Sequence, residues 1–478
     1  MKKISCLTGV CCAFLLQACQ GLSSSSSELM HIHDKATASV SKEDNDTPNV
    51  LFILLDDLGY GDVSYLGSEI QTPNIDKLAS QGVTIKHGYA SPICSPTRAA
   101  LMTGKNPLNF GIDGPMENDA MLPESLTTMP ERFQDAGYQT WMVGKWHLGM
   151  AKKSAMPHNR GFDDFYGFLG GFVDYYTHVY FGGLDWQENG KSLREEGFAT
   201  DLLTAKAIDK IQNFKGDKPF FMYLSYSAPH TPLQYVPNPI NDYSAIKSKD
   251  RQVFADFTSD VDQDIGEVLA VLDKQGLADN TIVVFMSDNG GNLEAGASNG
   301  EFIGGKGNVY EGGVRVPALV RWPAKFHGKT MSHPMFTQDW APTLLDAANI
   351  EYQSSDFDGV SQLALFKGEQ KPVAKRNVVL GIAAAKAVYQ WPWKLIASND
   401  GELHLFNLQK DEFERQDLAS QHPALVNELN AELVKLPSLP SKAAKGPPPE
   451  SLFLDENGHF NYEIRKPETR EPWADAAE

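Results

Sequence analysis

Cysteine is scarce in this sequence beyond its first residues. The chain has 478 residues and five cysteines, and four of them lie near the start, at Cys6, Cys11, Cys12 and Cys19. Past that segment Cys94 is the only cysteine, so no intrachain disulfide can form in the rest of the chain. A lone thiol in a large protein is either a small buried apolar residue or a chemically active group.

Basic residues are also in short supply. The chain has 42 Lys and Arg against 61 Asp and Glu, a formal net charge of -19. Such an acidic chain argues against nucleic acid as a partner. It allows an anionic substrate if the binding cleft is locally basic. With 42% hydrophobic and 22% charged residues the composition is globular, and the length suits one large domain and a smaller one.

The apolar stretch at the start is too short for an ordinary membrane span. Lys2 and Lys3 precede an apolar run through Leu16, which is typical of an export signal. The run ends in "LLQAC", which resembles the lipobox of bacterial lipoproteins and would make Cys19 the lipidated residue, although Gln17 is larger than usual there. The alternative is an ordinary signal peptide cut nearby. We expect a signal peptide over 1–18, a Ser-rich flexible tether over 19–47, and an exported protein anchored by lipid in the outer membrane, periplasmic or at the cell surface.

Continuous apolar runs recur along the rest of the chain. They are "NVLFILL" from Asn49, "YQTWMVG" before Lys145, "PFFMYLSYS" before His230 and "TIVVFMS" before Asp288. Runs of this kind indicate strands buried on both faces of a parallel sheet. Helical patterns lie between them and end at Gly82, Gly137 and Gly276. The alternation predicts an α/β fold with helices on both faces of the sheet.

The composition changes after "LFKGEQKPVAKRN". Short β-like runs follow, with a turn at Asn399–Gly401 and then the helical "PALVNELNAELVKL". This pattern predicts a small antiparallel sheet with a helix. We therefore divide the chain into a main domain over 48–370, a small α+β domain over 371–440 and a tail over 441–478 that lies along the surface.

Polar residues come directly after the buried runs. In open α/β sheets ligands bind at the carboxyl ends of the strands. Residues far apart in sequence should therefore meet at one edge, and the candidates are Asp56, Asp57, Lys145, His147, His230 and Asp288.

The lone thiol lies in "SPICSPTRAALMTGKNP". Pro96 suits the first turn of a helix that closes at Gly104, so Cys94 should lie at or beside the helix N-terminus, where anions are favoured. Arg98 should lie about one turn further on.

Several motifs together resemble one family. "PICSPTRAALMTG" resembles the sulfatase signature, whose core is Cys-x-Pro-x-Arg, and "GYQTWMVGKWHLG" resembles the second signature of that family. Further landmarks in the family's order are "NVLFILLDDLGYGD", "PHNRGFDDFYGF", "SAPHTP", "SDNGG" and "EGGVRVP". The resemblance runs from Asn49 to Trp322, and we expect it to continue through the C-terminal domain. It implies hydrolysis of sulfate esters and an alkaline-phosphatase-like fold: a large mixed, mostly parallel sheet flanked by helices, with a small C-terminal α+β domain.

The resemblance also implies a modified nucleophile and a metal. Cys94 would be oxidised to formylglycine by a separate enzyme, either a formylglycine-generating enzyme or an anaerobic maturase. One hydroxyl of the hydrated aldehyde would attack sulfur. Calcium is the implied ion, and the residues themselves do not separate it from magnesium. The positions that match the family's metal ligands are Asp56, Asp57, Asp288, Asn289 and the modified Cys94. Taken alone, adjacent Asp residues after a strand are more often a solvated turn.

Cationic residues and histidines match the remaining roles. The resemblance implies that Arg98 holds the modified residue, while Lys145 and Lys306 face the sulfate oxygens. It implies that His147 takes the proton of the second hydroxyl to expel sulfate, and that His230 protonates the leaving group. Without that context, a loop lysine or a lone histidine is as often structural as functional.

The substrate is the least constrained point. Export favours a sulfated carbohydrate, either a polysaccharide or a fragment of one. In "GGFVDYYTHVYFGG", the side chains of Tyr175, Tyr176 and His178 either contact a sugar or pack within the loop. Two other functions stay open: a phosphodiesterase of the same superfamily, which would generally use Ser or Thr and two metals, and an unmodified lipoprotein that only binds sulfated glycans.

Overall fold

The computed structural model describes residues 47–116, 120–150, 152–181, 183–369 and 375–443. The signal peptide, Cys19, almost all of the tether and most of the tail fall outside these ranges, as does the boundary placed at 370/371. Within them, no helix combines the length and the apolar character needed to cross a bilayer.

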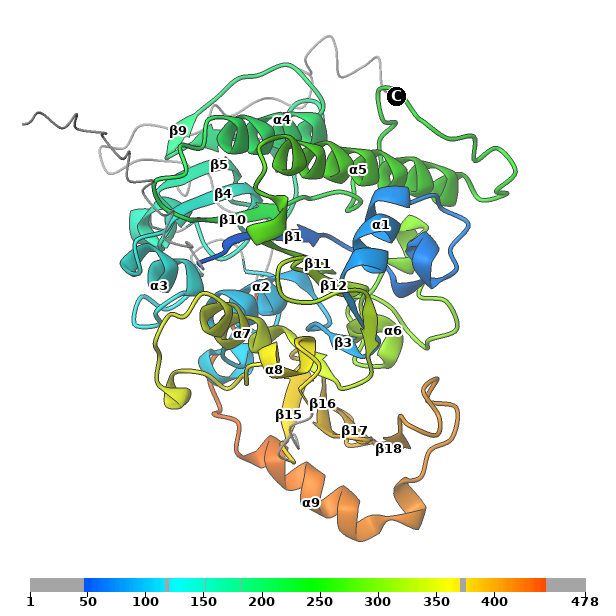
Figure 1. The fold of residues 1–478 in the computed structure, drawn as a ribbon. Helices are drawn as coiled ribbons and strands as arrows, with labels where there is room; N and C mark the ends of the chain where they lie inside the picture. The colour runs from blue at the N-terminus through cyan, green and yellow to red at the C-terminus, as the bar shows by residue number, and fades with distance from the viewer. Residues whose placement is uncertain (1–46, 117–119, 151, 182, 370–374, 444–478) are drawn as a thin grey trace, which may run out of the picture. The chain divides into compact units, whose positions relative to one another are not determined.

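A ten-stranded sheet forms the centre of the main domain (Figure 1). Five neighbouring strands run parallel in the order β11 (Thr281–Ser287), β1 (Asn49–Leu55), β10 (Phe220–Ser225), β4 (Gln139–Lys145) and β5 (Asp164–Phe168). The four apolar runs in the sequence are four of these strands. Every residue of β1, β10 and β11 is buried, which explains why the runs are continuously apolar rather than alternating.

Short strands extend the sheet at both edges and make it mixed. β12 (Ala318–Arg321) pairs antiparallel with β11 and with β2 (Val83–Ile85), and β13 (Lys329–Met331) pairs parallel with β2. At the other edge β8 (Gln187–Glu188) pairs antiparallel with β5 and with β9 (Lys191–Ser192). Two further two-stranded sheets join β3 (Gly88–Tyr89) to β14 (Met335–Phe336) and β6 (Val179–Tyr180) to β7 (Gly183–Leu184).

Helices cover both faces of the sheet (Figure 1). One face carries α1 (Pro73–Gln81), α4 (Ala199–Gln212) and α5 (Lys249–Lys274). The other carries α2 (Cys94–Thr103), α3 (Met129–Asp135), α7 (Trp340–Ala347) and α8 (Leu363–Phe366). A one-turn helix, α6 (Glu311–Val314), precedes β12. The predicted fold class is confirmed.

The C-terminal region is a four-stranded antiparallel sheet with one helix. The order is β15 (Val378–Gly381), β16 (Ala385–Gln390), β17 (Trp393–Ser398) and β18 (Leu403–Asn407). The turn at 399–401 joins β17 to β18 as expected, and Gly401 takes a left-handed φ of 89° there. On α9 (Pro423–Val434), Val426 and Leu429 pack against the sheet. After α9, Lys442 donates its backbone N–H to the carbonyl of Gly111, so the first tail residues run along the main domain.

Candidate active site

The parallel strands bring the polar candidates to one edge. β1 ends immediately before Asp56 and Asp57, β11 ends immediately before Asp288 and Asn289, and Lys145 is the last residue of β4. Because β1 lies between β10 and β11, the carboxyl ends of all these strands are neighbours. The expected meeting of these residues at one edge is confirmed.

Two lysines lie against the paired aspartates. Lys145 Nζ contacts Asp56 Oδ2, and Lys306 Nζ lies 2.8 Å from the carboxylate of Asp57. Burial alone would raise the pKa of Asp56, but Lys145 and the other nearby cations outweigh it, so the pKa of Asp56 falls below its usual range. Asp57 has a left-handed φ of 67°, and its backbone N–H donates to Asp288 Oδ1 at 3.3 Å. A left-handed backbone at a non-glycine residue is a strained conformation of the kind that is common at functional sites.

Arg98 ties the helix to the strand ends. It is completely buried, and its Nε and Nη2 donate to Asp288 Oδ2 at 3.1 and 2.9 Å. Its Nη1 donates to Ser225 Oγ at 2.6 Å and to the hydroxyl of Tyr223 at 3.3 Å. Tyr223 and Ser225 were not among the predicted site residues. They alternate along β10 and so share one face of the strand, which is the pattern that could have revealed them.

Cys94 begins α2, as predicted. Its Sγ lies 3.2 Å from Nδ1 of His147, and both residues are buried. Burial raises the pKa of the Cys94 thiol, although Lys145 and Lys306 oppose the shift. Burial also lowers the pKa of His147 well below its usual value, and Lys145 adds to that shift. The imidazole is therefore neutral, with Nε2 buried and without a hydrogen-bond partner.

His147 is held in an unusual backbone conformation. Its φ is 55°, its N–H donates to the carbonyl of Leu169, and its own carbonyl accepts from Ser95 Oγ at 2.9 Å. Ser95 follows Cys94 in the chain. The same short segment therefore positions both the thiol and the ring that faces it.

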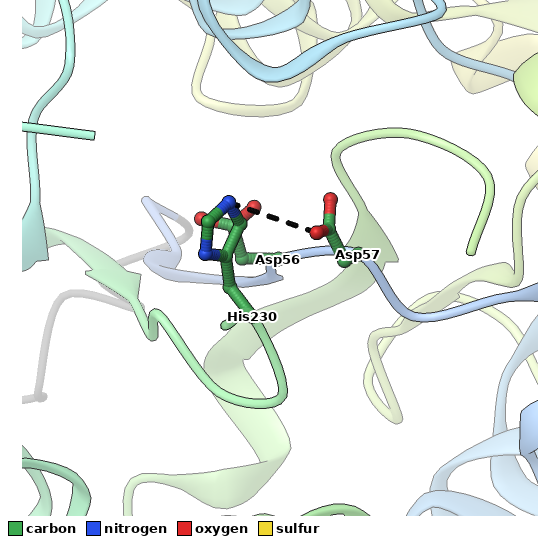
Figure 2. A group of neighbouring side chains, drawn as sticks. All are labelled: Asp56, Asp57 and His230. Atoms are coloured by element: carbon green, nitrogen blue, oxygen red, sulfur yellow. Dashed lines mark ion pairs between the residues drawn. The ribbon is translucent and has the colours of Figure 1, made fainter. Parts of the chain in front are cut away.

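His230 faces the aspartates from the segment after β10. Figure 2 shows its ring beside Asp56 and Asp57, and Nε2 lies 3.6 Å from Asp57 Oδ2. Nδ1 lies 2.5 Å from the carbonyl oxygen of Thr231, an arrangement in which Nδ1–H donates. Burial lowers the pKa of His230, and Lys306 adds to the effect while Asp57 opposes it. A neutral His230 in this tautomer presents Nε2 to the site as a proton acceptor, and a protonated one presents a donor.

The donor atoms fit a divalent cation. Asp56 Oδ1 and Asn289 Oδ1 are buried without a hydrogen-bond partner. Two groups of side chains each bring their ligand atoms within 4.8 Å of one another: Asp56, Asp57 and His230, and Asp56, Cys94 and Asp288. Burial and the negative charge of Asp56 raise the pKa of Asp288 to about 7. Crowded, buried carboxylates with free oxygens are suited to a hard cation, which would compensate their repulsion.

The aromatic loop does not offer its polar side chains to solvent. Tyr175, Tyr176 and His178 are 1%, 7% and 1% exposed. Tyr175 donates its hydroxyl to the carbonyl of His230 at 2.9 Å, and His178 stacks on Trp186 with ring centroids 4.4 Å apart. Tyr176 donates its hydroxyl to the carbonyl of Tyr235 at 2.6 Å. All three side chains are therefore packed against the protein, with partners that lie outside the quoted segment.

The comparisons agree with this geometry. Residues 48–350 match the sulfatase family. The chain belongs to the sulfatase family. Residues 302–438 also match the family described as N-sulphoglucosamine sulphohydrolase, C-terminal. As a member of the sulfatase family, the protein is an enzyme, a sulfuric ester hydrolase.

Relatives cover most of this sulfatase. Arylsulfatase J of Mus musculus is 32% identical over 444 residues, spanning 80% of this chain and 74% of its own length. N-acetylgalactosamine-6-sulfatase of Homo sapiens is 34% identical over 319 residues, spanning 60% of this chain and 59% of its own. The solved structure of Ps i-CgsB in complex with k-i-k-neocarrahexaose is 35% identical with a TM-score of 0.76, covering 81% of this chain and 92% of that one.

Proposed function

We propose that this sulfatase hydrolyses sulfate esters of carbohydrates through a formylglycine made from Cys94. The observation that carries the proposal is the position of Cys94. The residue is the first of α2, and its Sγ lies 3.2 Å from Nδ1 of His147. The same sulfur lies within 4.8 Å of carboxylate oxygens of Asp56 and Asp288. The sulfur marks the place where the hydroxyls of the hydrated aldehyde would stand. A nucleophile, a base and the ligands of a cation therefore share one buried site.

The proposed reaction has two covalent steps. One hydroxyl of the hydrated residue 94 gives its proton to the nearby carboxylate of Asp288 and attacks sulfur. The bond from sulfur to the ester oxygen then breaks, and a protonated His230 gives the departing alcohol its proton. His147 then takes the proton of the second hydroxyl. The bond from carbon to the sulfated oxygen breaks, sulfate leaves and the aldehyde returns. The Nδ1 of His147, 3.2 Å from Sγ of Cys94, and the Nε2 of His230 beside Asp57 support the separate roles of the two histidines.

Charge stabilisation comes from residues that are already in place. Asp56, Asp57, Asp288 and Asn289 would hold the divalent cation, for which calcium is the proposed ion. When bound, it supplies Lewis-acid polarisation of a sulfate oxygen. Lys145 and Lys306 contact carboxylates in this structure and would meet the oxygens of the sulfate group. Arg98 would hold the modified residue from one helical turn away.

A carbohydrate substrate is supported by the relatives. The structure of Ps i-CgsB holds k-i-k-neocarrahexaose, and one relative is named N-acetylgalactosamine-6-sulfatase. The deciding experiment measures sulfate release by the matured enzyme on a panel of defined sulfated oligosaccharides. Turnover of nitrophenyl sulfate with no activity on any sulfated sugar would contradict the carbohydrate proposal. Faster hydrolysis of a phosphate ester of the same alcohol would favour a phosphodiesterase.

Location is a separate proposal, based on the "LLQAC" motif. We propose that Cys19 is lipidated and anchors the protein to the outer membrane. The native protein should then partition into membranes, and Cys19→Ala should move it to the soluble fraction. Equal partition of both forms would indicate a plain signal peptide.

A further inference from the structure

A second group of carboxylates lies away from the active site, where α4 faces α5. Asp201 lies on α4, and Asp260 and Asp264 lie four residues apart on α5. Residues at this spacing share one face of a helix. One carboxylate oxygen from each of the three lies within 4.8 Å of the others. Like charges at this separation repel, so their convergence between two packed helices requires a physical explanation.

The group has no positive partner among the described residues. In the part of the chain that the structure describes, no Lys, Arg or His side chain forms an ion pair with Asp201, Asp260 or Asp264. Asp264 is only 8% exposed, and its Oδ2 is buried without a hydrogen-bond partner. Asp260 Oδ2 is buried and unpartnered as well. A buried carboxylate oxygen without a partner is costly, and such groups are normally paired or bound to a metal.

Exposure is graded across the group. Asp264 is buried, Asp260 is half-buried and Asp201 is exposed. A ligand could therefore enter from the side of Asp201 and keep water molecules there. This arrangement of carboxylates at the base and water at the mouth is typical of a hard divalent cation.

We propose that Asp201, Asp260 and Asp264 bind a calcium ion that joins α4 to α5. Calcium holds oxygens at about 2.3–2.6 Å, so two ligands on opposite sides of the ion lie up to about 5 Å apart. The three oxygens lie within 4.8 Å of one another, so all of them can contact one calcium ion. None of the three residues belongs to the active-site set, so this ion is distinct from the catalytic one.

The acid–base properties of the group agree with the geometry. Burial and the neighbouring carboxylates raise the pKa of Asp264 to about 8 and that of Asp260 to about 7. Without a cation, these side chains would retain protons near neutral pH. Asp201 and Glu267 raise the pKa of both residues, Asp260 also raises that of Asp264, and Asp256 also raises that of Asp260. A hydrogen bond from Thr204 opposes the shift at Asp264.

The position of the group gives the ion a structural role. Oγ1 of Thr204 on α4 lies 2.7 Å from the hydroxyl oxygen of Tyr226, the residue directly after β10. Four residues later the chain reaches His230, whose N–H donates to the carbonyl of Ser227 at 2.8 Å. An ion between α4 and α5 would hold fixed the helices that support this segment.

Calcium counting tests the proposal. The full chain is stripped with chelator and titrated with calcium chloride in a calorimeter, and bound calcium is measured by atomic spectroscopy after gel filtration. We expect two calcium ions in the wild type, one in Asp264→Asn, and two in the control Asp273→Asn, which changes another aspartate of α5. In Asp57→Ala, which alters the catalytic set, the helix site should still bind one ion, and adding Asp264→Asn should remove it.

Two outcomes would overturn the proposal. One is a wild type and an Asp264→Asn variant that bind the same number of calcium ions. The other is binding that Asp57→Ala removes completely. If Asp264→Asn does not fold, Asp201→Asn on the exposed side should weaken calcium binding at this site by about tenfold or more, because fewer ligand charges lower affinity. An unchanged affinity in Asp201→Asn would then count against the site. Calcium at this site does not depend on the substrate or on formylglycine, so the result is separable from the proposed function.

Discussion

The sulfur of Cys94 lies 3.2 Å from Nδ1 of His147, while Nε2 of the same ring is buried without a partner. The ring is held by the left-handed backbone at His147 and by the bond from Ser95 Oγ to the carbonyl of His147. Burial keeps the imidazole neutral by lowering its pKa. A neutral ring fixed against residue 94 is suited to accept a proton from a hydroxyl of that residue at Nδ1.

Replacement of His147 should therefore affect the second covalent step. His147→Ala should slow release of sulfate from residue 94 by about 10²–10⁴-fold, the usual contribution of a general base. This step is the same for all substrates. When it limits the rate, hydrolysis of a sulfated sugar and of nitrophenyl sulfate should therefore slow by the same factor. Intact mass spectrometry after rapid quenching should show a sulfated enzyme. Absence of that species together with normal turnover would remove His147 from the mechanism.

Maturation of Cys94 makes a second prediction. Protein from a host with a maturation enzyme should carry an aldehyde on the peptide around residue 94, detected by mass spectrometry. Cys94→Ala should abolish turnover and retain the fold, because the change removes only one sulfur atom from a small side chain. Fully active protein that shows only thiol at this position would contradict the formylglycine proposal and would reopen the non-catalytic alternative.

The active-site cation should be essential. The oxygens of Asp56, Asp57, Asp288 and Asn289 crowd one buried edge, and two of them have no partner. Exhaustive chelation should remove activity, and calcium should restore it. The Asp264→Asn variant provides the control, since its activity should still be lost on chelation and regained with calcium. Full activity in verified metal-free wild type would contradict the ligand assignment.

The main sheet and the meeting of the site residues could be predicted because buried parallel strands are continuously apolar. Their carboxyl ends then place Asp56, Lys145 and Asp288 together without further information. The short outer strands β2, β8 and β9 have only two or three residues, too few to show a period. Alternation along β10 groups Tyr223 with Ser225 on one face, but which face lies against Arg98 depends on tertiary packing.

Other features depend on pairings that sequence does not show. The aromatic loop has the same composition whether its rings contact a ligand or each other. Asp201 and Asp264 lie on different helices, and nothing local to either residue indicates the partner. For the same reason, the sequence does not predict the contacts of Lys145 with Asp56 and of Lys306 with Asp57.

The segment that carries Lys306 is tied to the C-terminal sheet by buried charges. Glu311, five residues after Lys306, lies 3.0 Å from Nζ of Lys394 on β17, and Lys394 also lies 2.7 Å from Glu414. The N–H of Glu311 donates to Glu414 Oε2 at 2.6 Å. Burial raises the pKa of Glu414 to about 7, with Lys394 opposing the shift and Glu311 adding to it.

This shift predicts a pH-dependent stability. The folded pKa of Glu414 lies above its ordinary value of 4.5, so its contribution is fully present below about pH 4.5 and is lost as pH rises through about 7. Urea unfolding across about pH 5 to 8 should show a smaller decline in unfolding free energy for Glu414→Gln than for the wild type. Parallel declines in the two proteins would show that Glu414 does not titrate in this window.

The last prediction concerns the proton donor. A sugar alkoxide is a poor leaving group unless it is protonated as the ester bond breaks, whereas a nitrophenolate leaves readily without that help. His230 Nε2 lies 3.6 Å from Asp57 Oδ2, at the edge where the ester oxygen would depart. His230→Ala should therefore lose about 10²–10⁴ in rate on a carbohydrate sulfate and much less on nitrophenyl sulfate. Equal losses on both substrates would make His230 a binding or structural residue. The proton would then come from another group, and Lys306, whose Nζ lies 2.8 Å from the same Asp57 carboxylate, is the next candidate.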